Sequence, residues 1–327
     1  MTSFQASVFK VIQRQRLFGV TLASHFSFTV HLPVTQRNPD LIFEASPSSP
    51  LAGGWELNSA VYTSPRHLPD GTSVCRLFRT PDYEVLSFPR TDFYLGADRI
   101  MCRLPEPGFH HLVESYLLGP VFAYWLERRS LPVLHASAVA FQGRAFAFLA
   151  AHGVGKSGLA AALLSRGAAL LCDDLVPVES CGGVLSAQPG FPQMRMWPDE
   201  ATCFLRRYEH LPRVAPDVDK RWVPAGPGGL GVFQHSPLPL GGIYFLERRP
   251  EGDAPIEIRE ISPRNALIEV LRHSFLPLLV AAAGLQPSRF DFFSRLVRDV
   301  PVRRLSYPSG FERLPEVADA VLRDLEC

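Results

Sequence analysis

Two patterns of hydrophobic and polar residues follow one another along the chain, and the change falls near residue 130. Up to about residue 105, short alternating or aromatic runs predict β-strands, since every second side chain of a half-buried strand faces the core. Pro, Gly, Asn and Asp residues separate these runs, which are Phe26–Leu32, Leu41–Ala45, Val74–Arg79 and Tyr83–Phe88. The last two runs flank Thr80-Pro81-Asp82 and therefore predict a hairpin.

Residues 109–128 show a helical spacing of apolar groups instead. Leu112, Tyr116, Val121 and Trp125 repeat at the period of a helix, which Gly119-Pro120 interrupts. We therefore expect a β-rich N-terminal domain over residues 1–128 and a second domain over residues 129–327.

The second domain begins with the pattern of an α/β nucleotide-binding unit. An apolar strand and a tight turn lead to a second apolar strand, a glycine-containing loop, a helix and a third apolar strand. The expected elements are Leu134–Phe141, Gln142-Gly143, Ala145–Leu149, loop 150–155, Lys156–Arg166 with Gly167 as its stop, and Ala168–Cys172.

The rest of the chain is less regular. Residues 183–230 are rich in Pro and Gly, which favours a loop-dominated segment. A strand is expected at Gly242–Glu247, and helices are expected at Pro263–His273, Phe290–Val297 and Pro315–Leu325.

Composition limits the class of protein. The 327 residues are 46% hydrophobic and 20% charged, with a formal net charge of +1, so no global field draws the protein to nucleic acid or to an anionic membrane. No apolar run is long enough to span a bilayer, and the first residues, Met1–Gln5, lack the pattern of a signal peptide. The six cysteines have no C-x₂-C spacing, which favours reduced thiols in a cytoplasmic protein over a zinc site or disulfides.

The loop after the second strand, Ala150-Ala151-His152-Gly153-Val154-Gly155-Lys156-Ser157, is a near match to the Walker A pattern G-x-x-x-x-G-K-[ST]. Gly153 and Gly155 let amide N–H groups turn inward around phosphate oxygens, and the following helix adds its positive end. Lys156 would place a full charge at the β- and γ-phosphates, and Ser157 would hold Mg²⁺. We therefore expect residues 151–158, ending at Gly158, to bind ATP.

Ala150 stands at the first glycine position of the pattern, which is tolerable if its backbone keeps a negative φ. A glycine-rich turn that binds nothing is the alternative. The flanking strand and helix argue against this alternative. The presence of Lys156 also argues against it, since only three of the 33 basic residues of the chain are lysines. His152 would either touch the γ-phosphate or serve as a solvent-facing spacer.

Asp173-Asp174 follows the third strand directly, at the kind of strand end where open α/β sheets place ligand groups. One carboxylate can order Mg²⁺ while its neighbour accepts the proton of an attacking hydroxyl. The alternative is a pair of turn caps, although adjacent aspartates repel and a turn needs only one.

These residues resemble the kinase domain of bacterial HPr kinase/phosphorylase, and more closely the HPr-kinase-related serine kinases, including those found beside lasso-peptide genes. His135 lies in Leu134–Val139, where that family has a histidine on the strand before the phosphate loop, and the paired acids follow the loop. The resemblance covers roughly residues 131–250. It implies an α/β P-loop kinase domain of the HPr kinase type (PEP-carboxykinase-like) behind a smaller β-rich N-terminal domain.

The resemblance also implies roles. Asp174 would be the proton acceptor, Asp173 its acidic neighbour at the metal, and His135 a polar group of the active site. Asp219-Lys220-Arg221 resembles the family's short segment that offers an arginine, here Arg221, to the transferring phosphoryl group. The residues alone leave alternatives, namely a core histidine at position 135 and a solvated loop at 220–221.

Two departures from the family pattern matter. Arg195 could match a family arginine, but Gln193 then occupies the position of a glutamate and Asp199 is a less certain substitute, so a second metal ligand is in doubt. The stretch Pro237–Gly242 lacks the two arginines that bifunctional members carry, and we predict a kinase without efficient phosphorylase activity.

The sequence thus predicts an ATP- and Mg²⁺-dependent serine kinase for a peptide or small-protein substrate. The family suggests a lasso-peptide precursor as the acceptor, and its ring assemblies leave a homo-oligomer open. Two alternatives are a nucleotide-responsive binding protein that has lost catalysis and an enzyme that transfers a nucleotidyl group to a peptide.

Overall fold

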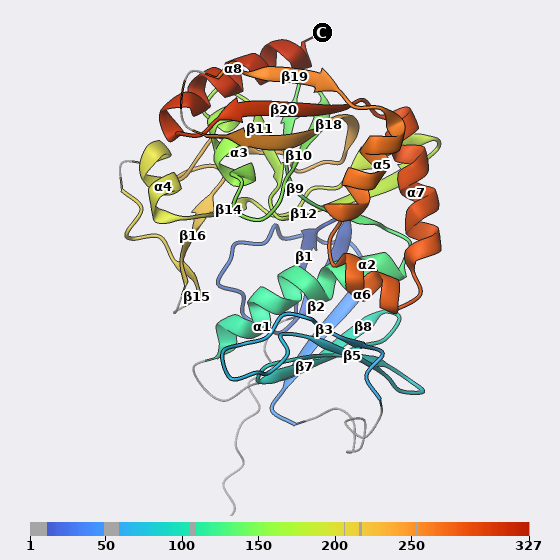
Figure 1. The fold of residues 1–327 in the computed structure, drawn as a ribbon. Helices are drawn as coiled ribbons and strands as arrows, with labels where there is room; N and C mark the ends of the chain where they lie inside the picture. The colour runs from blue at the N-terminus through green and yellow to red at the C-terminus, as the bar shows by residue number, and fades with distance from the viewer. Residues whose placement is uncertain are drawn as a thin grey trace, which may run out of the picture.

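The structure is a computed structural model that describes residues 12–48, 59–104, 109–205, 207–215, 218–250, 252 and 254–326. It is a mixed α/β structure with three sheets (Figure 1). Met1–Gln5 and Cys327, which entered the predictions above, lie outside the described residues, and the other five cysteines are free. Within the described part of the chain, no helix has both the length and the apolar character to cross a membrane.

The first sheet contains eight strands from the N-terminal part of the chain, in the order β1-β2-β3-β8-β7-β6-β5-β4. The hairpin predicted around residues 80–82 is confirmed, because β5 and β6 pair antiparallel with Leu77 opposite Leu86. The strands are β1 (Gln13–Leu17), β2 (Val20–Ser24), β3 (Leu41–Ser46), β4 (Tyr62–Thr63), β5 (Arg76–Arg79), β6 (Glu84–Phe88), β7 (Thr91–Leu95) and β8 (Arg99–Arg103).

The strand expected at Phe26–Leu32 is wrong. Side chains rather than a neighbouring strand satisfy its backbone N–H groups: Ser24 Oγ accepts from Phe26 N at 2.9 Å, and the Glu114 carboxylate accepts from Thr29 N at 3.0 Å and Val30 N at 2.9 Å. The aromatic run therefore packs as an irregular segment. A distant helix, invisible to local patterning, decides its conformation.

A kinked helical segment connects the two halves of the chain. It comprises α1 (His110–Tyr116), a π-helical turn (Leu117–Val121) and α2 (Phe122–Arg128), and its kink lies at Gly119, as the Gly119-Pro120 interruption predicts. Figure 1 shows α1 and α2 between the first sheet and the part of the molecule above it.

The second sheet contains nine strands from the rest of the chain. Its path is β17-β11-β9-β12-β13-β18-β20-β19, and β10 pairs parallel with β18 and antiparallel with β9. The strands are β9 (Val133–Phe141), β10 (Arg144–Leu149), β11 (Ala169–Cys172), β12 (Leu175–Cys181), β13 (Val184–Ala187), β17 (Val232–Phe233), β18 (Leu238–Arg249), β19 (Glu257–Glu260) and β20 (Val302–Pro308).

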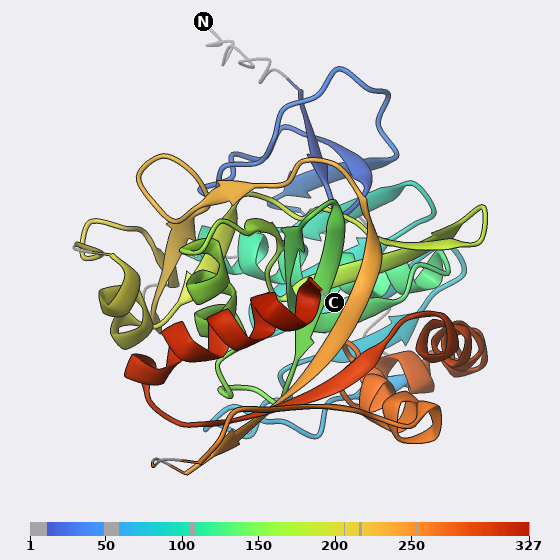
Figure 2. The same cartoon turned by 90° about the horizontal axis from the view of Figure 1, so that it is seen from above.

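Helices cover both faces of this sheet (Figure 2). On one face α3 (Lys156–Leu164) and α8 (Leu314–Leu325) form a hydrophobic cluster with Phe148 and Tyr244. On the other face α5 (Pro263–Arg272), α6 (Pro277–Ala282) and α7 (Gln286–Asp299) join a second cluster, to which α2 and the first sheet also contribute. Because this cluster runs from Leu17 to Val302, the two halves of the chain share one core.

The loop-dominated segment expected at residues 183–230 is only partly irregular. Besides β13 it contains β14 (Gln193–Met196), α4 (Pro198–Phe204), β15 (Arg213–Ala215) and β16 (Val218–Pro224), and β14-β16-β15 form a third sheet. These strands are short and pair across sequence gaps, so they lack the alternation and hairpin turns that identify strands locally. The division into domains at 128/129, which falls between α2 and β9, stays a prediction.

Candidate active site

The ends of three strands of the second sheet, β9, β10 and β11, lie close together. β10 and β11 both pair antiparallel with β9, so their C-terminal ends lie beside the N-terminal end of β9. Leu149 pairs with Ala136 and Leu175 pairs with His135, which brings the phosphate loop, the paired aspartates and the histidine to the same place. Topology thus assembles groups that lie far apart in the sequence.

The phosphate loop has the backbone that its glycines suggest. Gly153 has φ +82° and Gly155 has φ +104°, values that side-chain-bearing residues rarely adopt. A Cβ at Gly155 would also lie 3.7 Å from the Tyr307 hydroxyl and 4.0 Å from an Arg248 nitrogen. Ala150, at the first glycine position, is not among the positive-φ residues, so alanine is compatible with the loop.

Lys156 begins α3 and folds back over the loop. Its side chain is largely buried, and Nζ donates to the Ala150 carbonyl oxygen at 3.1 Å. Burial lowers the pKa of Lys156, and Lys220 lowers it further, while Asp174 and Asp173 oppose this shift. An ammonium beside the N-terminus of a helix is suited to neutralise the charge of a nucleotide's phosphates.

Asp173 links the loop to the sheet. Its Oδ1 accepts from Ser157 Oγ at 3.1 Å and from Ser137 Oγ at 2.6 Å, and its Oδ2 accepts from Arg195 N at 2.9 Å. Ser137 lies two residues after His135 on β9 and so faces the same side of the strand. Ser157 and Asp173 therefore present adjacent hard oxygen atoms, the ligand type that Mg²⁺ prefers.

Asp174 is held by two cationic or polar partners and by an unusual backbone. Its Oδ1 lies 3.2 Å from His135 Nε2, and its Oδ2 accepts from Arg195 Nη1 at 3.0 Å. Its φ of +73° is uncommon for a residue other than glycine, although aspartate tolerates it better than most. Such strain at a carboxylate that faces a cavity is typical of functional sites.

Charge around Asp174 overrides its burial. Burial alone would raise the pKa of this carboxyl, but Arg195 and then His135 and Lys156 hold it well below its usual range. His152, in the loop, has its pKa lowered by burial and by Lys220, Lys156 and His135. The site therefore places an ionised carboxylate among several cations, and these cations would attract a polyanionic ligand.

One cavity of about 390 Å³ is lined by the loop, both aspartates, His135 and Arg195. Because β11 and β18 lie on opposite sides of the β9–β10 hairpin, the cavity has two distinct ends. We call them the aspartate end, with His135, Asp174, Arg195 and Lys220, and the tyrosine end, with Arg248, Tyr307, Phe311 and Leu314. The phosphate loop from His152 to Gly158 lies between them, while Ala151 is exposed at its start.

The tyrosine end was not predicted from the sequence. Tyr307 is the penultimate residue of β20, and its hydroxyl donates to the Val154 carbonyl oxygen at 3.4 Å. Burial raises the pKa of Tyr307 to about 12. Arg248, near the end of β18, is exposed beside the loop. An aromatic and aliphatic surface with one cation is suited to a nucleotide base and sugar. No local motif marks these residues, since only the strand order brings them to the loop.

Arg195 and Lys220 occupy the aspartate end, whereas Arg221 does not. Cross-strand pairing places Arg195 opposite Trp222, and its guanidinium stacks on that indole at 4.8 Å. Lys220 lies two residues from Trp222 and hence on the same face of β16. Arg221 faces the other way and donates to the Leu211 carbonyl oxygen at 3.2 Å. The structure thus offers Lys220 to the cavity in place of Arg221.

Two further acids line the same cavity as Asp173 and Asp174. Asp199 and Glu200, at the start of α4, line the cavity, and burial raises the pKa of Glu200. Glu200 also accepts a hydrogen bond from Trp197 N at 3.0 Å, which caps the helix. Gln193 has a buried side-chain oxygen with no hydrogen-bond partner within the described structure. Glu200 is thus a further acid of the cavity, which the sequence pattern did not indicate.

Comparison with known proteins gives a distant likeness. No protein-family model and no curated relative matches the sequence. Among solved structures, the HPr(Ser) kinase/phosphatase from Coxiella burnetii matches with 14% sequence identity and a TM-score of 0.28, over 59% of this chain and 95% of that chain. The chemistry of the site therefore has to follow from the residues of this chain.

Proposed function

We propose that this protein is a phosphotransferase that moves the γ-phosphoryl group of ATP to a serine hydroxyl of a peptide or small protein. The observation that carries the proposal is the convergence of a Walker-A-like loop, Lys156 and an ionised Asp174 in one cavity. The resemblance to HPr-kinase-related serine kinases supports the same reaction class and makes a lasso-peptide precursor one acceptor to test.

The two ends of the cavity orient the nucleotide. The base and sugar would lie at the tyrosine end against Tyr307 and Phe311, and the phosphates would follow the loop and the N-terminus of α3. The γ-phosphate would then point to the aspartate end, where Lys220 and Arg195 add positive charge. Developing negative charge on the transferring group would be stabilised there without rearrangement of the site.

In the transfer step, the bond between the γ-phosphorus and the β,γ-bridging oxygen breaks while a bond to the acceptor oxygen forms. ADP leaves, and the hydroxyl proton passes to Asp174. A low pKa keeps Asp174 ionised and able to orient the hydroxyl. Positioning and electrostatic stabilisation supply most of the catalysis in phosphoryl transfer, so an ionised acceptor of this kind is adequate.

Ser157 and Asp173 would hold Mg²⁺, with Glu200 as a further acid in the same cavity. The ion would neutralise charge on the phosphates of the bound nucleotide. Mg²⁺ is commonly bound through one or two carboxylates together with substrate phosphates, and the pair Ser157–Asp173 fits that mode.

Mass spectrometry of candidate acceptors tests the proposal. Peptides encoded near this gene are incubated with ATP and Mg²⁺ and with wild-type protein or Asp174→Asn. Asparagine tolerates the positive φ of this position, so the variant removes charge with little strain. We expect one phosphate on a serine, formed at least about 100-fold more slowly by the variant.

Other outcomes identify the alternatives. Addition of a nucleotidyl group, which is several times heavier than a phosphoryl group, would replace kinase with nucleotidyl transferase. ATP binding with no modification of any acceptor and no ATP hydrolysis would favour a nucleotide-responsive binding protein. Transfer of the phosphoryl group from a phosphorylated acceptor to inorganic phosphate at millimolar concentration, with pyrophosphate as the product, would contradict the predicted lack of phosphorylase activity.

A further inference from the structure

A second cavity, of about 190 Å³, adjoins the aspartate end and has no role in the reaction described above. One wall is α1, which contributes His111 and Ser115, and the other wall is β15, which contributes Val214 and Ala215. In the sequence, α1 follows the strands of the first sheet, whereas β15 comes after the phosphate loop. The cavity therefore lies where the two halves of the molecule meet.

This cavity lies next to the active-site cavity. Val214 lines both cavities. Trp222 lines the second cavity, and the guanidinium of Arg195 stacks on its indole and donates to Asp174 Oδ2. Val214 and Trp222 thus lie between the second cavity and Asp174, the carboxylate that would orient the acceptor hydroxyl.

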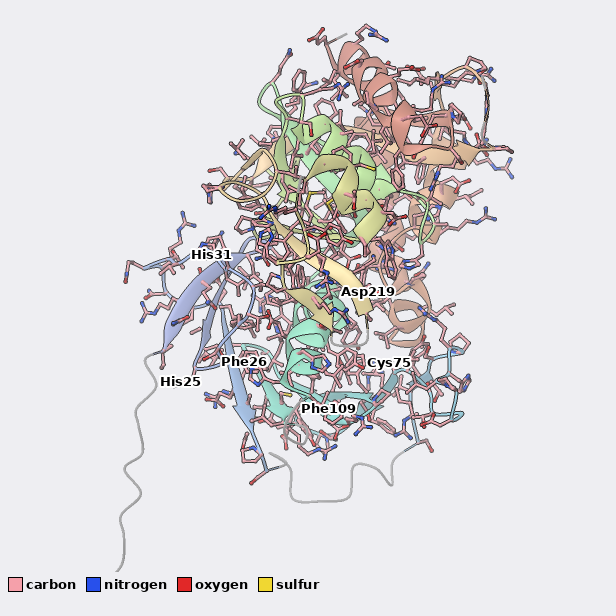
Figure 3. The ribbon with its side chains drawn as sticks, turned by 90° about the vertical axis from the view of Figure 1, so that its left-hand side faces the viewer. His25, Phe26, His31, Cys75, Phe109 and Asp219 are labelled. Atoms are coloured by element: carbon pink, nitrogen blue, oxygen red, sulfur yellow. The ribbon has the colours of Figure 1, made fainter. Side chains whose placement is uncertain are left out.

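The wall formed by β15 is suited to an extended chain. β15 is the last strand of the three-stranded sheet, and edge strands can accept a further strand through their backbone groups. Figure 3 shows β16, which carries Asp219, reaching toward the lower half of the molecule, where Phe109 marks the start of α1. α1 and β15 are in contact there, so the helix flanks the strand edge.

Charges around the second cavity are largely compensated. The Glu114 carboxylate accepts hydrogen bonds from Thr29 N, Thr29 Oγ1 and Val30 N, all between 2.7 and 3.0 Å. Arg213 forms an ion pair with Asp219 at 2.9 Å. A cavity with satisfied charges and an apolar floor at Trp222 favours backbone and uncharged side chains over a polyanion, whose place is at the phosphate loop.

We infer that an acceptor peptide lies extended along β15, between that strand and α1, with its hydroxyl-bearing residue directed past Val214 to Asp174. The inference rests on the proposed kinase function. It assigns a purpose to the N-terminal half of the chain, since α1 completes the acceptor groove. Nucleotide and acceptor then approach the γ-phosphate from opposite ends of the site.

The test uses phage-displayed random dodecapeptides, selected on the full-length protein with Mg²⁺ and a non-hydrolysable ATP analogue. Ser115→Trp and Ala215→Trp each fill the second cavity from one wall. Ser236→Trp, in a separate cavity beside β17, is the matched control. The selected peptides should bind wild type and control alike, and both cavity variants at least about tenfold more weakly, as when an interface pocket is blocked.

Thermal melting with and without ATP shows whether each variant is folded and binds nucleotide. If a variant does not fold, a selected peptide carrying a benzophenone group is cross-linked to the wild-type protein. Cross-links should map to residues 109–116 or 207–222. Cross-links elsewhere, equal binding to folded cavity variants, or no selected peptide would each overturn the inference.

The same peptides separate this inference from the proposed function. Peptides that bind in the groove and contain serine are incubated with ATP and Mg²⁺. Phosphorylation supports both conclusions. Binding that is sensitive to Ser115→Trp, without phosphorylation of any bound peptide and without ATP hydrolysis, would retain the groove and reject the kinase.

Discussion

The phosphate loop and the aspartate end of the same cavity are built in opposite ways. The loop is one contiguous segment, in which Gly153, Gly155, Lys156 and Ser157 act through backbone shape and a helix N-terminus. The aspartate end draws on β9, β14, β16 and the turn after β11. Its groups are polar side chains whose positions depend on strand register.

This difference determines which parts of the site tolerate amino-acid substitution. In the loop, the proposed phosphate contacts come largely from backbone amides, and alanine can replace the first glycine because φ there is not positive. At the aspartate end, a shift of one residue in a strand would turn a side chain to the opposite face. The neighbours Lys220 and Arg221 show this directly, since only the former lines the cavity.

The largest effect is expected for the loop. Lys156→Met removes the buried ammonium, and we expect phosphoryl transfer to fall on the order of 1,000-fold, because a charge aimed at the transition state is lost. Lys156→Arg should be nearly as impaired, since a planar guanidinium cannot replace a compact ammonium. Single-turnover kinetics measures both. Transfer within tenfold of wild type in Lys156→Met would show that the loop acts through its backbone alone.

A smaller effect is expected for Lys220 at the aspartate end. Lys220→Met should lower kcat on the order of tenfold to 100-fold, because one cation near the transferring group is lost. Arg221→Met is the matched control one residue away, and it should leave kcat within about twofold, as expected of a group that does not touch the reacting atoms. Steady-state kinetics with a serine peptide that the wild-type protein phosphorylates distinguishes them. The reverse order of the two effects would restore Arg221 to the catalytic role that the sequence suggested.

Arg195 tests how the aspartate end is held together. Arg195 keeps the pKa of Asp174 below the unfolded value of about 3.9, so the pair stabilises the fold above that pH and the contribution is lost as pH falls through the folded pKa. Arg195→Gln should therefore cost about 2 kcal/mol of unfolding free energy at pH 7. Urea denaturation should show the two proteins converging below pH 4. A difference that does not change with pH would reject the charge interaction as its cause.

The smallest effect is expected at the tyrosine end. Phe311→Ala should raise KM for ATP about fivefold to tenfold with little change in kcat, because contact with the base is made equally in ground and transition states. Phe290→Ala, at an exposed position on α7, is a control of the same chemistry. Isothermal titration with ATP measures the affinity. An unchanged affinity would place the base elsewhere in the cavity.

Much of the fold and the loop could be predicted from the sequence, since the information is local. The apolar runs on either side of the glycine loop located β10 and α3, the turn residues 80–82 between two strand-like runs located the hairpin of β5 and β6, and the interruption at Gly119-Pro120 located the kink. The conformation of a glycine loop between an apolar strand and a helix can be predicted from local sequence, because the residues that shape it are adjacent in the chain. The positions of Lys156, Ser157 and Asp173 follow from that unit.

Tertiary structure decided the rest, because strand order and register are properties of the whole chain. Only the pairing of β14 with β16 brings Arg195 and Lys220 to the cavity and turns Arg221 away. Only the position of β18 beside β10, and of β20 beside β18, brings Arg248 and Tyr307 to the loop. The irregular course of residues 26–32 depends likewise on Glu114, a contact across more than 80 residues. Local patterns carry no information about such partners.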